Sequence, residues 1–263
     1  MGAVGMFGRR KEENAGRGCR LGVLAGIGLA VIATTLPANA DEGCKYTVGW
    51  AEFPPYAIPS DNGVPRGVDI EYLQTVLNRR GCQVVFRNMP WIRAQIALEH
   101  GVVDILPYIA FNQKRESYGH FSIPYRDAVT GVLMRRDDKR LKFVHTLQDL
   151  GQRAMRIGVV RGVWNGPRLN ELKQGHPDLF EEYAETSLRV PMLLSGRADA
   201  IIDDRDSLVF DINQRGLSQR LVVLDIEVDR RPFHLLFSRK TVTLDEVQEI
   251  NRLIELVTYR RLE

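Results

Sequence analysis

The pattern of hydrophobic and polar positions predicts a first block of alternating strands and helices. Short apolar runs bounded by turn-forming residues predict buried strands at 46–50, 84–87 and 102–109. A helix between the first two is indicated by Ile70, Leu73, Val76 and Leu77, which recur on one face, and Gly81 ends it. A second helix follows Pro90 and ends before Gly101. This order is typical of a sheet with helices on both faces.

A second block of the same kind follows the charged run 135–140. Its predicted strands are 156–160, 199–202 and 221–224. Its predicted helices begin near Asn165, at 187–194 and at 207–215. The chain then ends in a helix that starts at Thr243, because Glu246 three residues later forms a capping box with it.

Two extended segments, 125–135 and 233–237, connect these blocks. We therefore predict an α/β fold of two lobes, each a mostly parallel sheet flanked by helices, joined by two extended crossovers. The first lobe comprises 41–134 plus 233–263, and the second comprises 135–232. A ligand cleft is expected between the lobes, where the carboxyl ends of the strands meet.

Residues 1–40 have the pattern of a secretory signal peptide. A basic segment precedes the uncharged apolar run 21–36, and Ala38-Asn39-Ala40 matches the site of signal peptidase. We expect cleavage after Ala40 and export to the periplasm. The alternative is an uncleaved membrane anchor, since sixteen apolar residues approach the ~17 that span a bilayer.

The chain after residue 40 has no net charge. Five of the 36 basic and two of the 33 acidic residues lie in 1–40, so the remaining chain carries 31 of each. A nucleic-acid-binding protein needs a basic surplus on some face, and this balance gives no sign of one.

Two of the three cysteines, Cys44 and Cys82, follow position 40. Each directly precedes a predicted strand, and adjacent parallel strands start at the same edge of a sheet. We therefore expect a disulfide in an oxidising compartment, with two buried free thiols as the alternative. Two cysteines without a Cys-x-x-Cys or paired histidines make no metal site, and no cofactor is expected.

Several segments then resemble family 3 of the periplasmic solute-binding proteins, the polar amino acid receptors of ATP-driven importers. The similar segments are 53–56 (FPPY), 67–71 (GVDIE), 101–104 (GVVD), Arg115, 121–125 (FSIPY), 158–162 (GVVRG) and 196–200 (GRADA). They occur in the family's order over nearly the whole chain after the signal peptide.

The resemblance implies a site for a zwitterion. Arg115 falls at the family's carboxylate-binding arginine, and a guanidinium can hold both carboxylate oxygens. Asp204 falls at the ammonium-binding aspartate, with neighbouring Asp203 as the rival. Phe53 and Trp91 fall where the family stacks aromatic rings on its ligand, with ordinary core packing as the alternative for both. The other candidate ligand-binding residues are Tyr56, Asp69, Tyr108, Ala110, Val163 and Trp164.

Some positions depart from the family pattern. Ala110 and Asn112 replace the usual hydroxyl residues, as do Val163 and Trp164 in the second lobe. Trp50 stands where receptors of lysine-like ligands carry an acidic residue, which disfavours a basic amino acid as the ligand. The helix near Asn165 is expected to aim its free N–H groups at the ligand carboxylate.

The resemblance thus implies a monomeric binding protein, not an enzyme, that closes on an amino acid-like ligand and delivers it to a membrane permease. One alternative is an enzyme similar to the periplasmic dehydratases on this fold, for which Glu71 and Glu52 are the candidate acid or base. A second alternative is a sensor or oxidase partner that has lost transport.

Overall fold

The strands form one mixed sheet in the computed structural model, which describes residues 44–259. The strands are β1 (Lys45–Trp50), β2 (Gln83–Asn88), β3 (Ile105–Ala110), β4 (Gly119–Phe121), β5 (Arg126–Arg135), β6 (Ile157–Val160), β7 (Phe180–Tyr183), β8 (Ala200–Asp204) and β9 (Leu221–Ser238). Their order is β2-β1-β3-β9-β5-β8-β6-β7, and β4 pairs with β9. The pairs β1–β2, β1–β3, β6–β7 and β6–β8 are parallel, whereas β5 and β9 run antiparallel to their neighbours. The predicted signal peptide lies outside the described residues.

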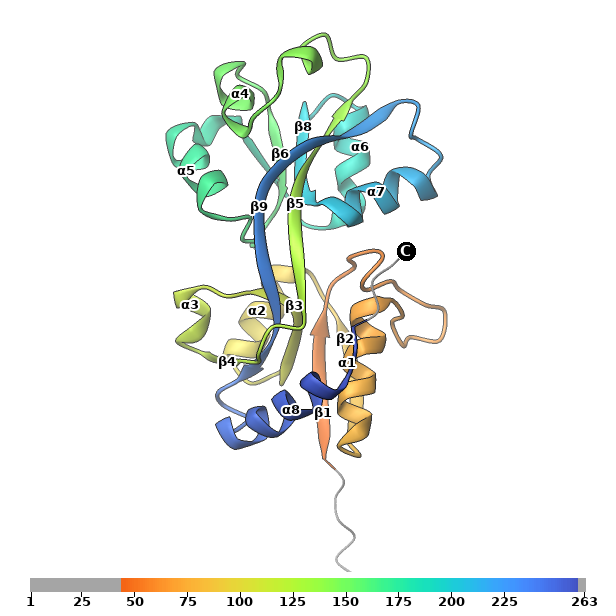
Figure 1. Cartoon of the computed structure of the whole chain (residues 1–263), viewed down its shortest axis with the longest axis vertical. Helices are drawn as coiled ribbons and strands as arrows, with labels where there is room; N and C mark the ends of the chain where they lie inside the picture. The colour runs from red at the N-terminus through yellow and green to blue at the C-terminus, as the bar shows by residue number, and fades with distance from the viewer. Residues whose placement is uncertain (1–43, 260–263) are drawn as a thin grey trace, which may run out of the picture. The chain divides into compact units, whose positions relative to one another are not determined.

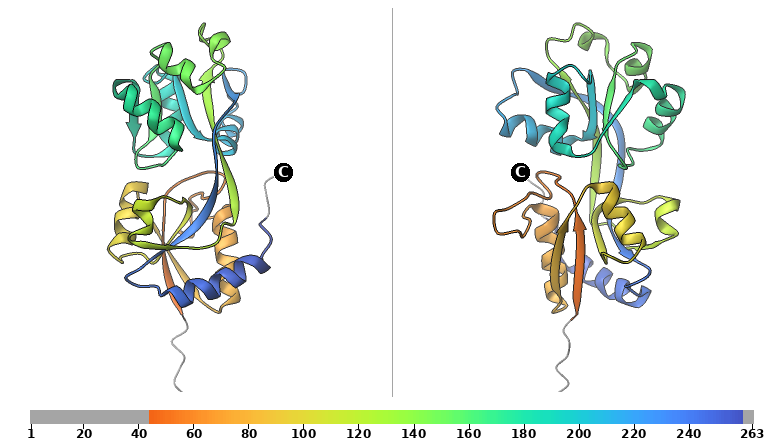
Figure 2. Two further views of the ribbon diagram at one scale, coloured as in Figure 1. Left: turned by 60° about the vertical axis from the view of Figure 1, so that its left-hand side comes forward. Right: turned by 180° about the vertical axis from the view of Figure 1, so that it is seen from behind.

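Helices cover both sides of this sheet (Figure 2). The α-helices are α1 (Val68–Arg79), α2 (Trp91–Glu99), α3 (Gln113–Glu116), α4 (Leu147–Gln152), α5 (Pro167–Gly175), α6 (Arg189–Leu194), α7 (Arg205–Gln214) and α8 (Leu244–Leu256). Three short 3₁₀ turns occur at Leu141–Phe143, Pro177–Leu179 and Thr186–Leu188. None of the helices within 44–259 has the length and hydrophobicity needed to cross a bilayer.

The described chain forms two lobes, which confirms the predicted fold class (Figure 1). The first lobe contains β1–β4, α1–α3 and α8, and residues such as Val48, Leu73 and Ile250 form its core. The second lobe contains β6–β8 and α4–α7, with Leu150 and Ile202 in its core. Each core is formed by the apolar face of the sheet and the apolar stripes of the helices that cover it.

Strands β5 and β9 pass through both lobes side by side (Figure 1). The segment predicted as extended at 125–135 is β5. The predicted strand 221–224 and the predicted crossover 233–237 belong to one strand of 18 residues, β9. The intervening stretch 225–232 carries five charged residues, so no apolar run indicated a strand there. Pairing with β5 makes it one.

The predicted disulfide between Cys44 and Cys82 is present. The two residues precede β1 and β2, which pair in parallel from Lys45 opposite Gln83. Their Cα atoms are 4.6 Å apart. Strands that start at one edge of the sheet therefore bring the sulfurs together, as the sequence pattern predicted.

Candidate functional site

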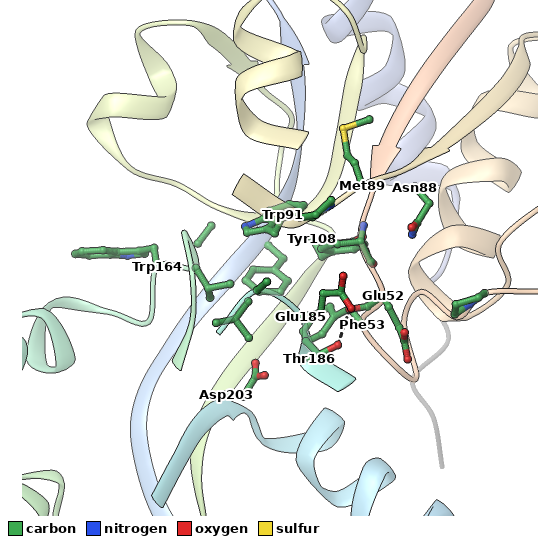
Figure 3. A pocket seen from close by; sticks show the side chains of 18 of the residues that line it. Glu52, Phe53, Asn88, Met89, Trp91, Tyr108, Trp164, Glu185, Thr186 and Asp203 are labelled. Carbon is green, nitrogen blue, oxygen red and sulfur yellow. Dashed lines mark hydrogen bonds between the residues drawn. The ribbon is translucent and has the colours of Figure 1, made fainter. Parts of the chain in front are cut away.

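A cavity of about 150 Å³ lies between residues of the two lobes. Most of its lining residues end or follow parallel strands of the two lobes, as expected for an α/β sheet. Those that the first lobe contributes are Ala51, Glu52, Phe53, Pro59, Asn88, Met89, Pro90, Trp91, Tyr108, Ala110 and Arg115. The others are Val160, Val163, Trp164, Ala184, Glu185, Thr186 and Asp203, together with Phe233 on β9. Figure 3 shows many of these side chains.

Arg115 is a buried cation at this cavity, with 4% of its surface exposed. It is held by neutral groups: Nη1 donates to Ala110 O at 2.8 Å, and Nε and Nη2 donate to Gln95 Oε1 at 3.2 and 3.1 Å. Among residues 44–259, no carboxylate lies within 4.0 Å of it. Burial lowers the pKa of the guanidinium to about 10, which still leaves it charged at neutral pH. Arg115 is therefore a desolvated charge without an anionic partner in the described chain.

Asp203 is the buried carboxylate at the cavity and already has a partner. Its Oδ2 accepts from Arg189 Nη1 at 3.1 Å, and its Oδ1 accepts from Asp204 N at 2.8 Å. Arg189, itself 1% exposed, also pairs with Asp211. Because each carboxylate oxygen has two lone pairs, Asp203 can still accept hydrogen bonds from a ligand.

Asp204 does not line the cavity. It caps α7, because Oδ1 accepts from Ser207 N at 3.0 Å, and the same oxygen accepts from the Tyr56 hydroxyl at 3.0 Å. Its Oδ2 is 4.0 Å from Arg126 Nη1. Successive side chains of a strand point to opposite faces, so only one of two adjacent aspartates on β8 can point into the cavity, and it is Asp203.

Burial raises the pKa of Asp204 to about 6, and Arg126 and the Ser207 N–H oppose this shift. A carboxyl with a higher pKa when folded binds its proton more tightly in the folded chain. Its contribution to the free energy of unfolding is therefore largest below the unfolded pKa of about 4, and it is lost as pH rises through about 6. As pH rises from about 4 to 7, we expect the free energy of unfolding of the wild type to fall by on the order of 2 kcal/mol relative to that of Asp204→Asn. Denaturation experiments at a series of pH values measure this difference. A difference in free energy of unfolding between the two proteins that stays constant over this pH range would contradict the prediction.

Tyr56 and Asp69, also predicted to bind ligand, belong to a buried charge network beside the cavity. Asp69 accepts from Arg126 Nε at 2.9 Å and from its Nη2 at 2.8 Å, and the Tyr259 hydroxyl donates to it at 2.7 Å. The Arg126 guanidinium lies 3.7 Å from the centroid of the Tyr56 ring. Neither candidate lines the cavity.

The remaining candidates, Phe53, Trp91, Tyr108, Ala110, Val163 and Trp164, line the cavity together with Arg115. Three of the rings form an aromatic wall, with the Tyr108 centroid 5.4 Å from that of Phe53 and 5.3 Å from that of Trp91.

The expected helix N-terminus near Asn165 does not line the cavity. A Cβ on Gly166, the residue before α5, would lie 2.5 Å from Asp229 Cγ, so a carboxylate of the chain already occupies the space beside that terminus.

Tyr108 owes its position to an irregular backbone. It adopts a φ of 44°, rare for a bulky residue, and the pairing of β3 with β9 shifts register between Leu106 and Ile109. Its N–H donates to the Tyr125 hydroxyl at 2.9 Å, and its own hydroxyl donates to Ala51 O at 2.9 Å. Such strained residues gather at functional sites, where surrounding contacts fix them.

Direct contacts join the two lobes around the cavity. Gln95 Nε2 donates to Gly162 O at 3.0 Å, and Thr186 Oγ1 donates to Glu52 O at 2.7 Å.

The sequence did not indicate Thr186 and the adjacent Glu185 as site residues, because β7 (FEEY) is short and polar and was not predicted. If β7 had been predicted as a parallel neighbour of β6, the residues that follow it, 184–186, would have been candidates for the cavity. No group of three potential metal ligands occurs within 44–259.

The comparisons with known proteins agree with this architecture. The chain is 24% identical over 206 residues to the L-cystine-binding protein TcyJ of Escherichia coli K12, covering 74% of each chain. It is 25% identical over 244 residues to the glutamate-binding protein GluB of Corynebacterium efficiens, covering 86% of this chain and 79% of the relative. An ancestral arginine-binding protein bound to glutamine has a similar fold, with 21% identity, a TM-score of 0.69 and coverage of 81% and 91%.

The family model of the bacterial extracellular solute-binding proteins, family 3, matches residues 46–204, more than half of the chain. The match spans both lobes, including Arg115 and Asp203. The chain belongs to family 3 of the bacterial extracellular solute-binding proteins.

Proposed function

We propose that the cavity binds one free amino acid. The observation that carries this proposal is Arg115, a buried guanidinium whose partners in the described chain are neutral. A ligand carboxylate can use Nη1 and Nη2 together if it displaces the weak contact of Nη2 with Gly162 O, which is 3.4 Å long. Asp203, the carboxylate on the second lobe, accepts the ligand ammonium, and Phe53, Trp91 and Tyr108 contact the side chain.

The relatives support the class of ligand. TcyJ and GluB are named for the amino acids cystine and glutamate, and both relatives align with most of this chain. We assign the binding of the ligand ammonium to Asp203 and not to Asp204, because Asp203 lines the cavity, whereas Asp204 is engaged with Tyr56 and Ser207.

The proposed role is capture and delivery. The lobes, 41–134 plus 233–263 and 135–232, close on the ligand by bending of β5 and β9, and the closed form docks on the permease of an ATP-driven importer. The protein acts as a monomer in the periplasm, to which the signal peptide predicted at 1–40 directs it.

A thermal-shift screen of the purified protein against the common amino acids tests the proposal. A ligand at one hundred times its dissociation constant is expected to add about 2.7 kcal/mol to the free energy of unfolding, because it binds only the folded chain. At least one amino acid should raise the melting temperature in a concentration-dependent way. A screen in which none of them does so would refute the proposal.

The same sample separates binding from catalysis. As a binding protein it is expected to leave prephenate and arogenate unchanged on prolonged incubation, as followed by chromatography. Turnover of either compound would instead favour a dehydratase, for which Glu52 is a carboxylate at the cavity.

A further inference from the structure

Two glutamates from opposite lobes lie at the cavity without a cationic partner. Glu52 follows β1 and Glu185 follows β7, and both line the cavity. Within residues 44–259, no basic side chain lies within 4.0 Å of either carboxylate. Asp203 differs from them, because it has a basic partner, Arg189, at 3.1 Å.

The contact between the lobes brings these two acidic residues close to each other. Thr186 Oγ1 donates to the backbone oxygen of Glu52 at 2.7 Å, and Thr186 is the residue next to Glu185. In Figure 3 both glutamates lie on the same side of the cavity as Phe53, away from Trp164. Two carboxylates at one cavity repel each other, and a cation bound between them would offset this repulsion.

The aromatic wall beside these glutamates also suits a cation. The hydroxyl of Tyr108 is engaged with Ala51, so only its ring is available to a ligand. Phe53 and Trp91 contribute further rings within 5.4 and 5.3 Å of it. The faces of aromatic rings attract ammonium and guanidinium groups, most strongly where water is excluded.

We propose that Glu52 and Glu185 form a binding site for a second cationic group of the ligand, and that the ligand is therefore an amino acid with a cationic side chain. This inference rests on the proposed function: Arg115 and Asp203 bind the α-carboxylate and α-ammonium, and the two glutamates remain for the side chain. It reverses the expectation drawn from Trp50. Trp50 is 4% exposed in the core of the first lobe and does not line the cavity, so its identity does not determine the charge there.

Calorimetry with L-arginine and L-citrulline tests this inference, because citrulline has nearly the shape of arginine but a neutral side chain. The wild-type protein is expected to bind arginine at least about tenfold more tightly than citrulline. In the double variant Glu52→Gln/Glu185→Gln the ratio should fall to about threefold or less. Glu255→Gln, which removes an exposed carboxylate from α8, is the matched control and should keep the wild-type ratio.

The outcomes separate this inference from the proposed function. Equal affinities of the wild type for arginine and citrulline, or a ratio unchanged in the double variant, would overturn the role of the glutamates. If neutral amino acids then bind through Arg115, the proposed function stands without this inference. If no amino acid binds at all, both this inference and the proposed function are refuted. A melting curve of each variant verifies that it is folded.

Discussion

Replacing Arg115 by alanine is expected to weaken amino acid binding by about 3–5 kcal/mol, a loss of at least roughly 100-fold in affinity. The guanidinium is 4% exposed, and the ligand carboxylate would have to enter this desolvated site without a counter-charge. Calorimetric titration with the tightest ligand of the thermal-shift screen measures the effect.

Arg115→Lys and Arg93→Ala are the controls for this experiment. Lysine keeps the charge but cannot hold both carboxylate oxygens, so we expect an intermediate affinity. Arg93 is exposed on α2 and does not line the cavity, so its removal should leave binding unchanged. If Arg115→Ala binds as tightly as wild type and remains folded, Arg115 is not the carboxylate site.

Replacing Asp69 by asparagine is expected to lower the free energy of unfolding by about 3–5 kcal/mol. Asp69 is 1% exposed, and its carboxylate contacts Arg126 through Nε and Nη2, with Nη2 at 2.8 Å. Within residues 44–259, the variant leaves the buried Arg126 guanidinium with Asp204 as its one remaining counter-charge, which is more distant, at 4.0 Å. Urea denaturation followed by circular dichroism measures the change.

Glu71→Gln is the matched control, since Glu71 lies on the same helix but is exposed. Its loss should change stability by no more than about 0.5 kcal/mol. An Asp69→Asn variant that is destabilised as little as this control would show that the buried ion pair contributes nothing to the fold.

Local signals in the sequence were sufficient for most elements. The capping box of Thr243 and Glu246 begins α8 as predicted, with the hydroxyl accepting from Glu246 N and the Glu246 carboxylate accepting from Thr243 N. The apolar stripe of α1 and the alternating order of strands and helices likewise predicted the two-lobed fold. These signals are reliable because the hydrogen bonds of a helix end and the spacing of an apolar stripe depend on residues within one or two turns.

Polar and short elements could not be predicted in the same way. The charged middle of β9 and the four residues of β7 lack an apolar pattern, and each becomes a strand because a neighbouring strand pairs with it. Glu185 and Thr186 were therefore missed, although they line the cavity.

The sequence by itself determined the fold class, the disulfide and the position of Arg115, because periodicity, strand starts and an ordered set of family motifs are local properties of the chain. Only the tertiary structure decided which carboxylates face the cavity. Asp203 and Asp204 are adjacent on β8, and the direction of the strand's pleat selects Asp203, while pairing across the lobes brings Glu52 and Glu185 to the same cavity. Both choices depend on contacts between residues far apart in the chain, which no local pattern specifies.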